Sequence, residues 1–533
     1  MTATEAPARA TPSPPGPRVI IIGAGSRGRA YANAIRSATN GVVAAVAELD
    51  DYKRMSFGRE MIWGSQTPPP EGTCFTHWRD FISYETQRRR RIEVGEKNVP
   101  PGVDAAFVCV LDDMHREVVV ALAALGKIHI MCEKPLATTL QDCLTMYRAL
   151  QSNKVAGGQQ AVFAVGHVLR YSPHNLLLHQ LVVRDRAIGD VLSVAHTEPV
   201  GWFHFAHSYV RGNWRKEKTS APSLLTKCCH DIDLLLWFLC SPPDPAIDGS
   251  LPHLPSTVSS TGSLQHFKRS RKPPGARSAT NCLSCPIESE CNFSAKRIYV
   301  GPDVVGLETM NTGWPVKIVV PDIESYNTMN EAKAALLTEL AKDYDDRTPE
   351  SEVSQRSWYG RCVYECDNDV CDEQVVTISW DEEEHPGKEG TPTVRNAKTA
   401  ILHMVAQTKK VCERYTHLYG VDGEIFADSE TITIEDFRTG KKTVHRPEGE
   451  CRGHGGGDVG LTRQFILAVD KVKNHGWTTD KAQRELIGCT LEEVIRSHAM
   501  VFCAEEARHN KKVIDWKDWW FAELKAHGFE GLA

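Results

Sequence analysis

The sequence predicts an α/β protein of two domains, in which a parallel sheet flanked by helices is followed by an α/β domain with a large, mostly antiparallel open sheet. Short β-branched or apolar runs alternate with helical periodicity from residue 18 to about residue 160. Beyond that point β-rich runs recur with fewer helices between them. The length of 533 residues alone predicts two to four domains, and the sequence patterns narrow this number to two.

Composition excludes several classes of protein. The chain has 62 Lys+Arg against 68 Asp+Glu, and a charge this near neutral argues against nucleic acid as the main partner. No run of 18 apolar residues occurs, so no membrane span is expected. Residues 1–17 are rich in Ala, Thr and Pro without the apolar stretch of a secretory signal, and they predict a disordered tail. Seventeen cysteines in such a chain indicate a reducing compartment, the cytoplasm.

The first strand, at residues 19–22, runs into the glycine-rich turn Gly23-Ala24-Gly25-Ser26-Arg27-Gly28 and then into a helical segment. Gly23 permits a tight turn, Gly25 lets a pyrophosphate approach the backbone, and Gly28 lets helix and strand pack closely. The helix N-terminus then faces the phosphates. This pattern predicts a dinucleotide-binding Rossmann domain over residues 18–160, with Gly23, Gly25, Ser26, Arg27 and Gly28 at the cofactor.

The second strand, at residues 42–47, ends in an acid that indicates which dinucleotide binds. Glu48 lies twenty residues after Gly28, where a carboxylate can accept a hydrogen bond from a ribose 2′-hydroxyl. The same charge would repel a 2′-phosphate, so NAD is favoured over NADP. Lys53 and Arg54 follow closely enough to keep NADP as an alternative.

Further strand and helix segments continue the parallel sheet. A buried-strand run at 104–110 precedes a helical pattern at 115–125 and another strand at 129–132, which leads directly into Glu133 and Lys134. Ligands of open parallel sheets bind beyond the carboxyl ends of the strands. We therefore expect Glu133 and Lys134 at the cofactor crevice.

Four motifs in order resemble the Gfo/Idh/MocA family, which includes glucose-fructose oxidoreductase and inositol dehydrogenase. The motifs are the glycine turn, Glu133-Lys134-Pro135, Gly166-His167-Val168-Leu169-Arg170-Tyr171, and His230-Asp231-Ile232-Asp233 leading to Trp237. The resemblance covers residues 18–270 and, more loosely, 360–516. It implies hydride transfer between nicotinamide and a secondary alcohol of a sugar, polyol or related ring, and a small-molecule carbohydrate or polyol as substrate.

The resemblance also implies a second domain, residues 161–533, whose open sheet forms the floor of the active site and often an interface in a homo-oligomer, here a dimer or tetramer. The sequence supports this sheet independently, because β-rich runs occur at 191–197, 258–265, 375–380, 399–404, 415–420 and 431–437. Helical patterns follow at 461–472 and 481–507. Between them, Asp458 is the expected N-cap, and His454 and Asp458 are candidates to reach the substrate cleft.

Oxidising an alcohol requires a base for the hydroxyl proton and positive charge to stabilise the alkoxide as it forms. The resemblance matches His230 to the family's active-site histidine and Lys134 to the lysine that binds the reacting hydroxyl, so both are predicted to be catalytic. It places Arg170 and Tyr171 near the nicotinamide and the substrate. Both residue types are also enriched at protein interfaces, which is the alternative for this pair.

The chain departs from the family pattern one helical turn before His230, where many relatives have an aspartate and this chain has Thr226. Threonine can hydrogen-bond a substrate hydroxyl but cannot accept a proton as aspartate does. Lys227 follows, and it either faces solvent or enters the site beside Lys134, each ammonium then lowering the pKa of the other. We expect Thr226 and Lys227 to contact the substrate.

A cysteine cluster lies in a predicted insertion near residues 242–360. Cys282, Cys285 and Cys291 have the spacing C-x₂-C-x₅-C, which suits a structural zinc or part of an iron–sulfur cluster, with free thiols as the alternative. A closed site needs a fourth ligand, and the candidates are His266, Cys362, Cys366 and Cys371. Such a site would pin the insertion and take no part in catalysis.

Three functions fit these motifs. The first is an NAD(P)-dependent dehydrogenase. The second is a non-catalytic NAD(P)-binding regulatory protein, since the resemblance extends to a galactose-pathway repressor. The third is a glycosidase that uses NAD for transient oxidation, for which the missing aspartate leaves room. The pairing of Lys134 with His230 favours an enzyme, because a binding module has no need of an acid–base pair.

Overall fold

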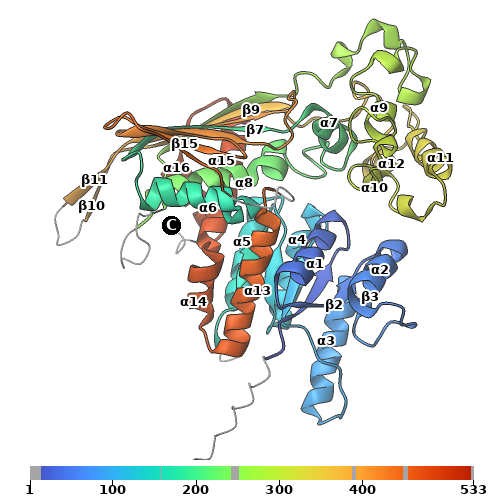
Figure 1. Ribbon diagram of the computed structural model, residues 1–533, viewed down its shortest axis with the longest axis horizontal. Helices are drawn as coiled ribbons and strands as arrows, with labels where there is room; N and C mark the ends of the chain where they lie inside the picture. Colours follow the sequence, from blue (N-terminus) through green and yellow to red (C-terminus); the bar gives the residue numbers. More distant parts are fainter. Residues whose placement is uncertain (1–13, 156–157, 242–250, 387–391, 448–453, 530–533) are drawn as a thin grey trace, which may run out of the picture.

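The structure is a computed structural model that describes residues 14–155, 158–241, 251–386, 392–447 and 454–529. Most of the expected N-terminal tail and part of the insertion after residue 241 therefore lie outside the described residues. Two sheets with helices between them organise the rest of the chain (Figure 1). This arrangement confirms the predicted fold class.

The N-terminal sheet is the predicted Rossmann sheet. Its six strands are all parallel and lie in the order β3-β2-β1-β4-β5-β6. They are β1 (Arg18–Ile22), β2 (Val42–Ala47), β3 (Cys74–Phe75), β4 (Ala105–Val108), β5 (His129–Cys132) and β6 (Phe163–Val165). The strand order reverses between β1 and β4, and ligands of such sheets bind at this reversal, outside the carboxyl ends of the strands.

Helices cover both faces of this sheet. They are α1 (Ser26–Ala38), α2 (Asp51–Gly58), α3 (Trp78–Glu93), α4 (His115–Leu125) and α5 (Leu140–Ser152). The helix α13 (Gly457–His475), from near the other end of the chain, packs against α1. Strand β6 also lies just past the expected domain boundary at residue 160, so the Rossmann layer takes in chain from both predicted domains.

The second sheet has nine strands in the order β16-β15-β14-β13-β7-β12-β9-β8-β17. All neighbours are antiparallel except the parallel pair β7 and β12. The strands are β7 (Val191–Pro199), β8 (Thr257–Ser263), β9 (Glu373–Trp380), β12 (Lys398–Val405), β13 (Tyr415–Gly420), β14 (Gly423–Ala427), β15 (Ile432–Asp436), β16 (Lys442–His445) and β17 (Ile514–Asp515), and β10 (Glu383–Pro386) pairs with β11 (Pro392–Arg395) as a separate hairpin. Every strand predicted for this domain is present.

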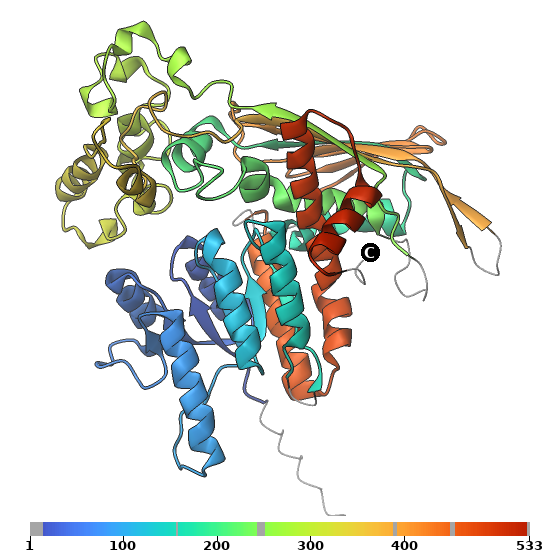
Figure 2. The ribbon, with the colours of Figure 1, turned by 180° about the vertical axis from the view of Figure 1, so that it is seen from behind.

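One face of the large sheet is covered by helices that separate it from the Rossmann domain (Figures 1 and 2). They include α6 (Pro173–His179), α8 (Ser223–Cys240) and α15 (Leu491–Asn510), with α7 (Trp202–Phe205) and α16 (Trp516–Ala526) at the periphery, while α14 (Thr479–Ala482) lies beside α13 (Figure 1). All residues of α8 are buried, as expected for a helix enclosed on every side.

Two predictions about the C-terminal helices are wrong. The continuous helix expected at 481–507 is divided at Gly488, whose φ of 63° leaves the right-handed helical region. Asp458 is not an N-cap, because α13 begins one residue earlier, after Gly456, and the Asp458 carboxylate bonds to Arg27.

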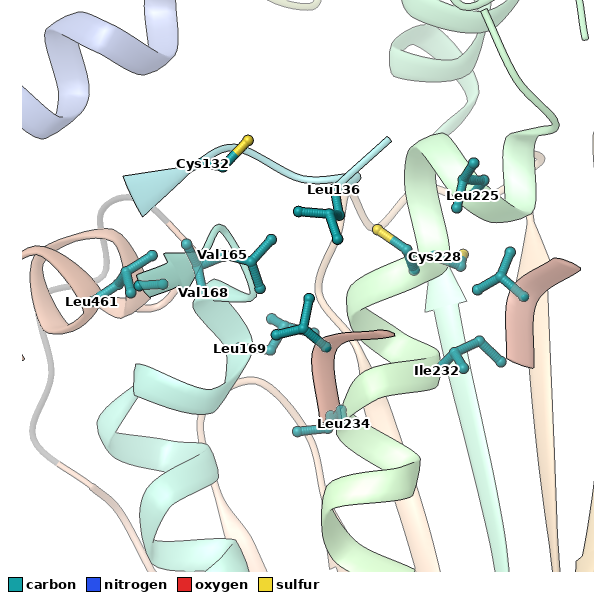
Figure 3. Packing of buried hydrophobic residues seen from close by; sticks show 14 of the residues in the cluster. Cys132, Leu136, Val165, Val168, Leu169, Leu225, Cys228, Ile232, Leu234 and Leu461 are labelled. Atoms are coloured by element: carbon teal, nitrogen blue, oxygen red, sulfur yellow. The ribbon is translucent and has the colours of Figure 1, made fainter. Parts of the chain in front are cut away.

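The two domains share one continuous hydrophobic core (Figure 3). Cys132 and Val165 at the ends of β5 and β6 lie near Leu461 of α13, and the same cluster continues to Leu225 and Ile232 of α8. Burial of these side chains removes apolar surface from water on both domains at once. The core therefore holds the ends of the parallel strands against α8.

The segment between β8 and β9 lies at one end of the large sheet (Figures 1 and 2). Its described residues form short helices and turns and contribute no strand to either main sheet. The helices are α9 (Ala295–Tyr299), α10 (Val316–Val319), α11 (Met329–Leu340) and α12 (Glu350–Gln355).

Candidate active site

The glycine turn after β1 has the shape of a pyrophosphate cradle. Gly23 has a φ of 97°, and a Cβ there would lie 2.4 Å from the Cys109 carbonyl oxygen. A Cβ on Gly28 would lie 2.0 Å from the Gly23 carbonyl oxygen, so α1 packs against the turn only because this position is glycine. A Cβ on Gly25 would meet nothing within 4 Å. The open space at Gly25, where Ser26 begins α1, fits a dinucleotide phosphate.

The Glu48 carboxylate is fixed beside this turn. Its Oε2 accepts a hydrogen bond from the Ala24 backbone N–H at 2.7 Å, and its Oε1 accepts one from the Asp50 N–H at 3.0 Å. Arg54 donates to the Glu48 backbone oxygen at 2.7 Å and pairs with Asp51. Arg54 is therefore engaged, and a carboxylate stands at the end of β2, where Rossmann folds bind the ribose.

Arg27 and Glu133, both predicted at the cofactor, bind each other. Arg27 Nε lies 2.6 Å from Glu133 Oε1, and Arg27 Nη2 lies 2.8 Å from Asp458 Oδ1. Burial alone would raise the pKa of Glu133, but Arg27 and the Tyr31 hydroxyl hold it below its usual value. The two side chains thus tie the glycine turn to β5 and α13, and their contact with the cofactor stays a prediction.

Lys134 meets α8 at the turn that precedes His230. Its Nζ donates to the Thr226 backbone oxygen at 2.6 Å and lies 6.0 Å from the centre of the Trp214 ring. The Thr226 hydroxyl donates to the Pro222 oxygen at 3.3 Å within the helix. The structure therefore brings Lys134, Thr226 and His230 together, but Thr226 contributes its backbone oxygen to Lys134.

The partner of His230 determines which of its ring nitrogens carries the proton. His230 Nε2 lies 2.7 Å from Arg414 Nη2, and a guanidinium has only donors, so Nε2 is the acceptor. Burial lowers the pKa of His230 well below its usual value, and Arg414 and Lys134 lower it further against the opposing effect of Asp231. The neutral ring therefore has its proton on Nδ1. That atom is buried and has no hydrogen-bond partner among the described residues.

This tautomer changes the role expected of His230. A ring nitrogen that carries a proton donates a hydrogen bond and does not accept one. The nitrogen with the lone pair is occupied by Arg414. His230 would therefore donate a hydrogen bond to a substrate oxygen and stabilise its negative charge. Another group must then act as the base.

Lys227 belongs to a buried charge cluster beneath this site. Its Nζ lies 3.2 Å from Glu198 Oε1 and 2.9 Å from Cys412 Sγ. Burial alone would lower its pKa, but Cys412 and Glu198 more than offset this, so the pKa is raised. Arg414 Nε pairs with Glu198 Oε2 at 2.9 Å and with Asp231 Oδ1 at 2.5 Å. The exposed lysine and the pair of lysines with lowered pKa, both considered from the sequence, are therefore wrong.

Arg170 and Tyr171 lie apart from the catalytic candidates. Arg170 makes a two-pronged ion pair with Asp233, at 2.7 and 2.9 Å, and the Tyr171 hydroxyl donates to the Ile487 oxygen at 2.8 Å. Both line a cavity of about 1090 Å³ whose lining includes neither catalytic candidate. Their side chains join α8 to the segment around Ile487, and their contact with a substrate stays a prediction.

The structure places His454 beside the site, as the sequence suggested. Its ring centre lies 6.1 Å from that of His230, and its Nδ1 lies 3.2 Å from Asp458 Oδ1. Asp458 in turn binds Arg27. A chain of contacts therefore links the glycine turn to His230.

Sequence reasoning missed three charged residues near the site. Asp112 accepts a hydrogen bond from the Trp214 indole at 2.7 Å, and burial raises its pKa. Its position just after β4, at the carboxyl end of a parallel strand, was a signal that could have found it. Glu198 and Arg414 gave no such signal, because only the folded chain brings them to α8.

The predicted metal ligands Cys282, Cys285 and Cys291 line one small cavity together with Cys362. The other candidates for the fourth ligand, His266, Cys366 and Cys371, do not line it. Every cysteine in the described part of the chain is free.

A comparison with protein-family models matches residues 73–158 to the Gfo/Idh/MocA model, described as "Oxidoreductase family, NAD-binding Rossmann fold". This region of the chain is similar to that oxidoreductase family. Among its curated relatives, 2,7-anhydro-N-acetylneuraminate hydratase of Escherichia coli K12 is 30% identical over 153 residues, which are 28% of this chain and 38% of that protein. Inositol 2-dehydrogenase of Acidothermus cellulolyticus is 30% identical over 224 residues, 41% of this chain and 52% of that one. The matches thus span from about a third to about half of these relatives.

Solved structures resemble this chain in fold over most of its length. Levoglucosan dehydrogenase in complex with NADH and levoglucosan superposes with a TM-score of 0.55 at 14% identity, covering 93% of this chain and 98% of the other. At this identity the likeness concerns the fold alone. Within the described residues, every helix is too short or too polar to cross a membrane.

Proposed function

We propose that this protein is an NAD-dependent dehydrogenase that transfers hydride between nicotinamide and a secondary alcohol of a sugar, polyol or related ring. The observation that carries the proposal is the convergence of Lys134 and His230 on one turn of α8, at the carboxyl ends of the Rossmann strands. The unpartnered Nδ1 of His230 provides a donor for a ligand oxygen. A module that only binds a nucleotide has no use for this pair.

In this proposal Lys134 transfers the proton, and His230 stabilises the negative charge on the oxygen. Bound NAD would accept the hydride from the carbinol carbon. Lys134 is placed to take the hydroxyl proton, and the His230 Nδ1–H donates to the oxygen while it carries negative charge. In the reverse direction Lys134 returns the proton. This assignment uses the tautomer that Arg414 selects.

Two features support NAD and a ring substrate. The Glu48 carboxylate favours a ribose with a free 2′-hydroxyl, and Arg54 is already paired. The Trp214 ring near Lys134 offers an apolar face against which the C–H groups of a sugar or cyclitol could pack. Relatives and structural neighbours include proteins named for inositol and levoglucosan, which are such rings.

The test is a screen of sugars, anhydrosugars and polyols for NADH formation by the purified protein. Lys134→Gln should lower kcat by about 10²- to 10⁴-fold, since a positioned acid–base group contributes that much. NAD affinity should stay largely unchanged. Lys154→Gln, at an exposed lysine, is the matched control and should keep full activity.

Three results of these experiments would contradict the proposal. Full activity of Lys134→Gln would remove the catalytic assignment. Tight NAD binding without conversion of any compound would favour the regulatory alternative. Conversion of an anhydrosugar or glycoside without net NADH would favour transient oxidation, a possibility raised by the relative named as a hydratase.

A further inference from the structure

We propose that Cys282, Cys285, Cys291 and Cys362 bind one Zn²⁺ ion in the segment between β8 and β9, far from the catalytic candidates in the sequence. The four side chains come from two stretches of chain and line one cavity. Four thiolates around one ion form a closed structural site, in which no position is left for substrate.

Backbone pairing brings the two stretches together. The Cys282 N–H donates to the Gly360 oxygen at 2.8 Å, and the Cys362 N–H donates to the Thr280 oxygen at 2.8 Å. Asn281 and Arg361 form an antiparallel bridge between these bonds. This pairing sets Cys282 opposite Gly360 and Cys362 opposite Thr280, so the two cysteines are diagonal neighbours on the same face of the paired segments. Cys362 is therefore the fourth ligand that the sequence spacing could not select.

Arg211 supplies an independent reason to expect negative charge here. It is fully buried against this cavity, and no carboxylate in the described structure pairs with it. Its side chain donates to the Arg361 and Phe293 backbone oxygens, both at 2.7 Å, and lies 3.4 Å from Cys282 Sγ. Its Nη1 is buried without a partner among the described residues. A buried guanidinium without an anion is costly, and a Zn²⁺ with four thiolates carries a net charge of −2 that would balance it.

The size of the cavity favours a single ion. Its volume is about 20 Å³, which is enough for one small ion. In a tetrahedral zinc site the sulfurs lie about 3.8 Å apart, from a Zn–S distance of about 2.3 Å. No three described cysteine sulfurs lie within 4.8 Å of one another. Side-chain rotation on binding would therefore draw the thiols inward around the ion.

A structural metal ion would stabilise the segment that holds these cysteines. It contains short helices and turns and has no strand in the main sheets among its described residues. Small segments of this kind bury little apolar surface, and a structural metal offsets that deficit. The ion would hold the segment in place at the end of the large sheet.

Metal analysis of the full-length protein tests the proposal directly. Protein purified anaerobically without metal-affinity resin or chelators should contain about one zinc per chain, released by a thiol-directed mercurial. Cobalt substitution should give the intense charge-transfer bands of a thiolate-bound ion. Cys291→Ser and Cys362→Ser should lower zinc to below about 0.1 per chain. Cys366→Ser is the matched control and should keep the zinc, because Cys366 is a neighbour that does not line the cavity.

Each alternative outcome overturns part of the proposal. Less than about 0.1 metal per chain in the wild-type protein would remove the site, whatever the variants do. Iron with acid-labile sulfide, lost in the same variants, would replace zinc by an iron–sulfur cluster. Zinc that persists in folded Cys291→Ser and Cys362→Ser would place the metal elsewhere. None of these readouts depends on enzymatic activity.

Discussion

At the residue scale, the chemistry of His230 depends on its contact with Arg414. A histidine in the proposed active site is expected to act as a base, but the ring nitrogen that would accept the proton accepts a hydrogen bond from a guanidinium at 2.7 Å. Glu198 and Asp231 hold Arg414 in turn. Because a guanidinium does not lose its proton, the tautomer of His230 is fixed by its surroundings.

Glu48 is expected to set the preference between NAD and NADP. Glu48→Gln keeps an oxygen acceptor for the Ala24 N–H and the ribose but removes the negative charge that repels a 2′-phosphate. The ratio of NADP to NAD affinity should rise about tenfold, which corresponds to about 1.4 kcal/mol. Calorimetric titration with both nucleotides measures this ratio. An unchanged ratio would show that another group discriminates between the cofactors.

At the element scale, two glycines of the turn after β1 are required for different reasons, one for packing of the fold and one for binding of the cofactor. One glycine packs against backbone atoms and another faces open space, although both belong to the same turn. Helix α8 shows a similar division. Its whole surface is buried, yet one of its turns offers polar groups to the Rossmann strand ends.

Two substitutions in the glycine turn should affect different properties, one the melting temperature and the other the affinity for NAD. Gly28→Ala places a Cβ 2.0 Å from the Gly23 oxygen, so it should lower the melting temperature by several degrees. Gly25→Ala meets nothing within 4 Å and should leave the melting temperature nearly unchanged. It should nevertheless weaken NAD binding by tenfold or more, because the methyl group occupies the phosphate position. Equal effects on stability from both variants would contradict this division.

The uncovered face of the nine-stranded sheet is a candidate interface for a homo-oligomer. Register pairs Phe426 with Thr433 and Thr433 with Val444, so these side chains share one face, and Phe426 and Val444 are 42% and 46% exposed. On neighbouring strands of this face, Ile401 is 40% exposed. Contiguous apolar surface of this kind often marks a protein interface.

A charge on this face should therefore weaken assembly. We expect the wild-type protein to be a dimer or tetramer by light scattering coupled to size exclusion, and Phe426→Glu to shift it towards monomer. Val94→Glu is the control, because Val94 is 81% exposed on the Rossmann domain. A wild-type monomer at micromolar concentration would refute the assignment of this face.

At the scale of the whole molecule, several histidines are buried in both domains and at their junction. Burial lowers the pKa of His129 to about 4, against a smaller opposing effect of Asp104, and lowers that of His167 to about 4 against Asp233. Both therefore have folded pKa values below the unfolded value of about 6.5. The unfolded chain binds more protons below that pH, so stability present above pH 6.5 is lost as the pH falls towards 4.

Denaturation at two pH values tests this expectation. Each of the two histidines should cost about 2 kcal/mol of unfolding free energy between pH 7.5 and pH 5. The midpoint of urea denaturation should fall accordingly, and His129→Gln should reduce the pH dependence. A midpoint that is the same at both pH values would mean that these rings are protonated in the folded state.

Sequence patterns predicted most of the fold because hydrophobic periodicity records which faces are buried. The helix at 115–125 and the strand at 129–132 have the predicted bounds. The break at Gly488 was missed because the apolar spacing continues on both sides of it. Strands β14 and β16 were missed because they are short and carry polar residues on one face.

The candidate site was only partly predictable. Lys134 follows a strand and His230 lies in a motif, so local sequence marked both. Arg414 and Glu198 lie on two other segments of the chain, and only the packing of the sheet against α8 brings them to His230. The sequence spacing likewise left the partner of the three clustered cysteines open, and the pairing of residues 280–282 with 360–362 points to Cys362.

The sequence by itself determined the Rossmann layer, the glycine cradle and the positions of Lys134 and His230, because short-range spacing and burial periodicity encode these features. The tertiary structure alone decided the tautomer of His230, the burial of Lys227 and the structural pairing of Arg170 with Asp233. Each of these depends on a partner distant in sequence. Electrostatic interactions act across space and not along the chain, so these roles became visible only after folding.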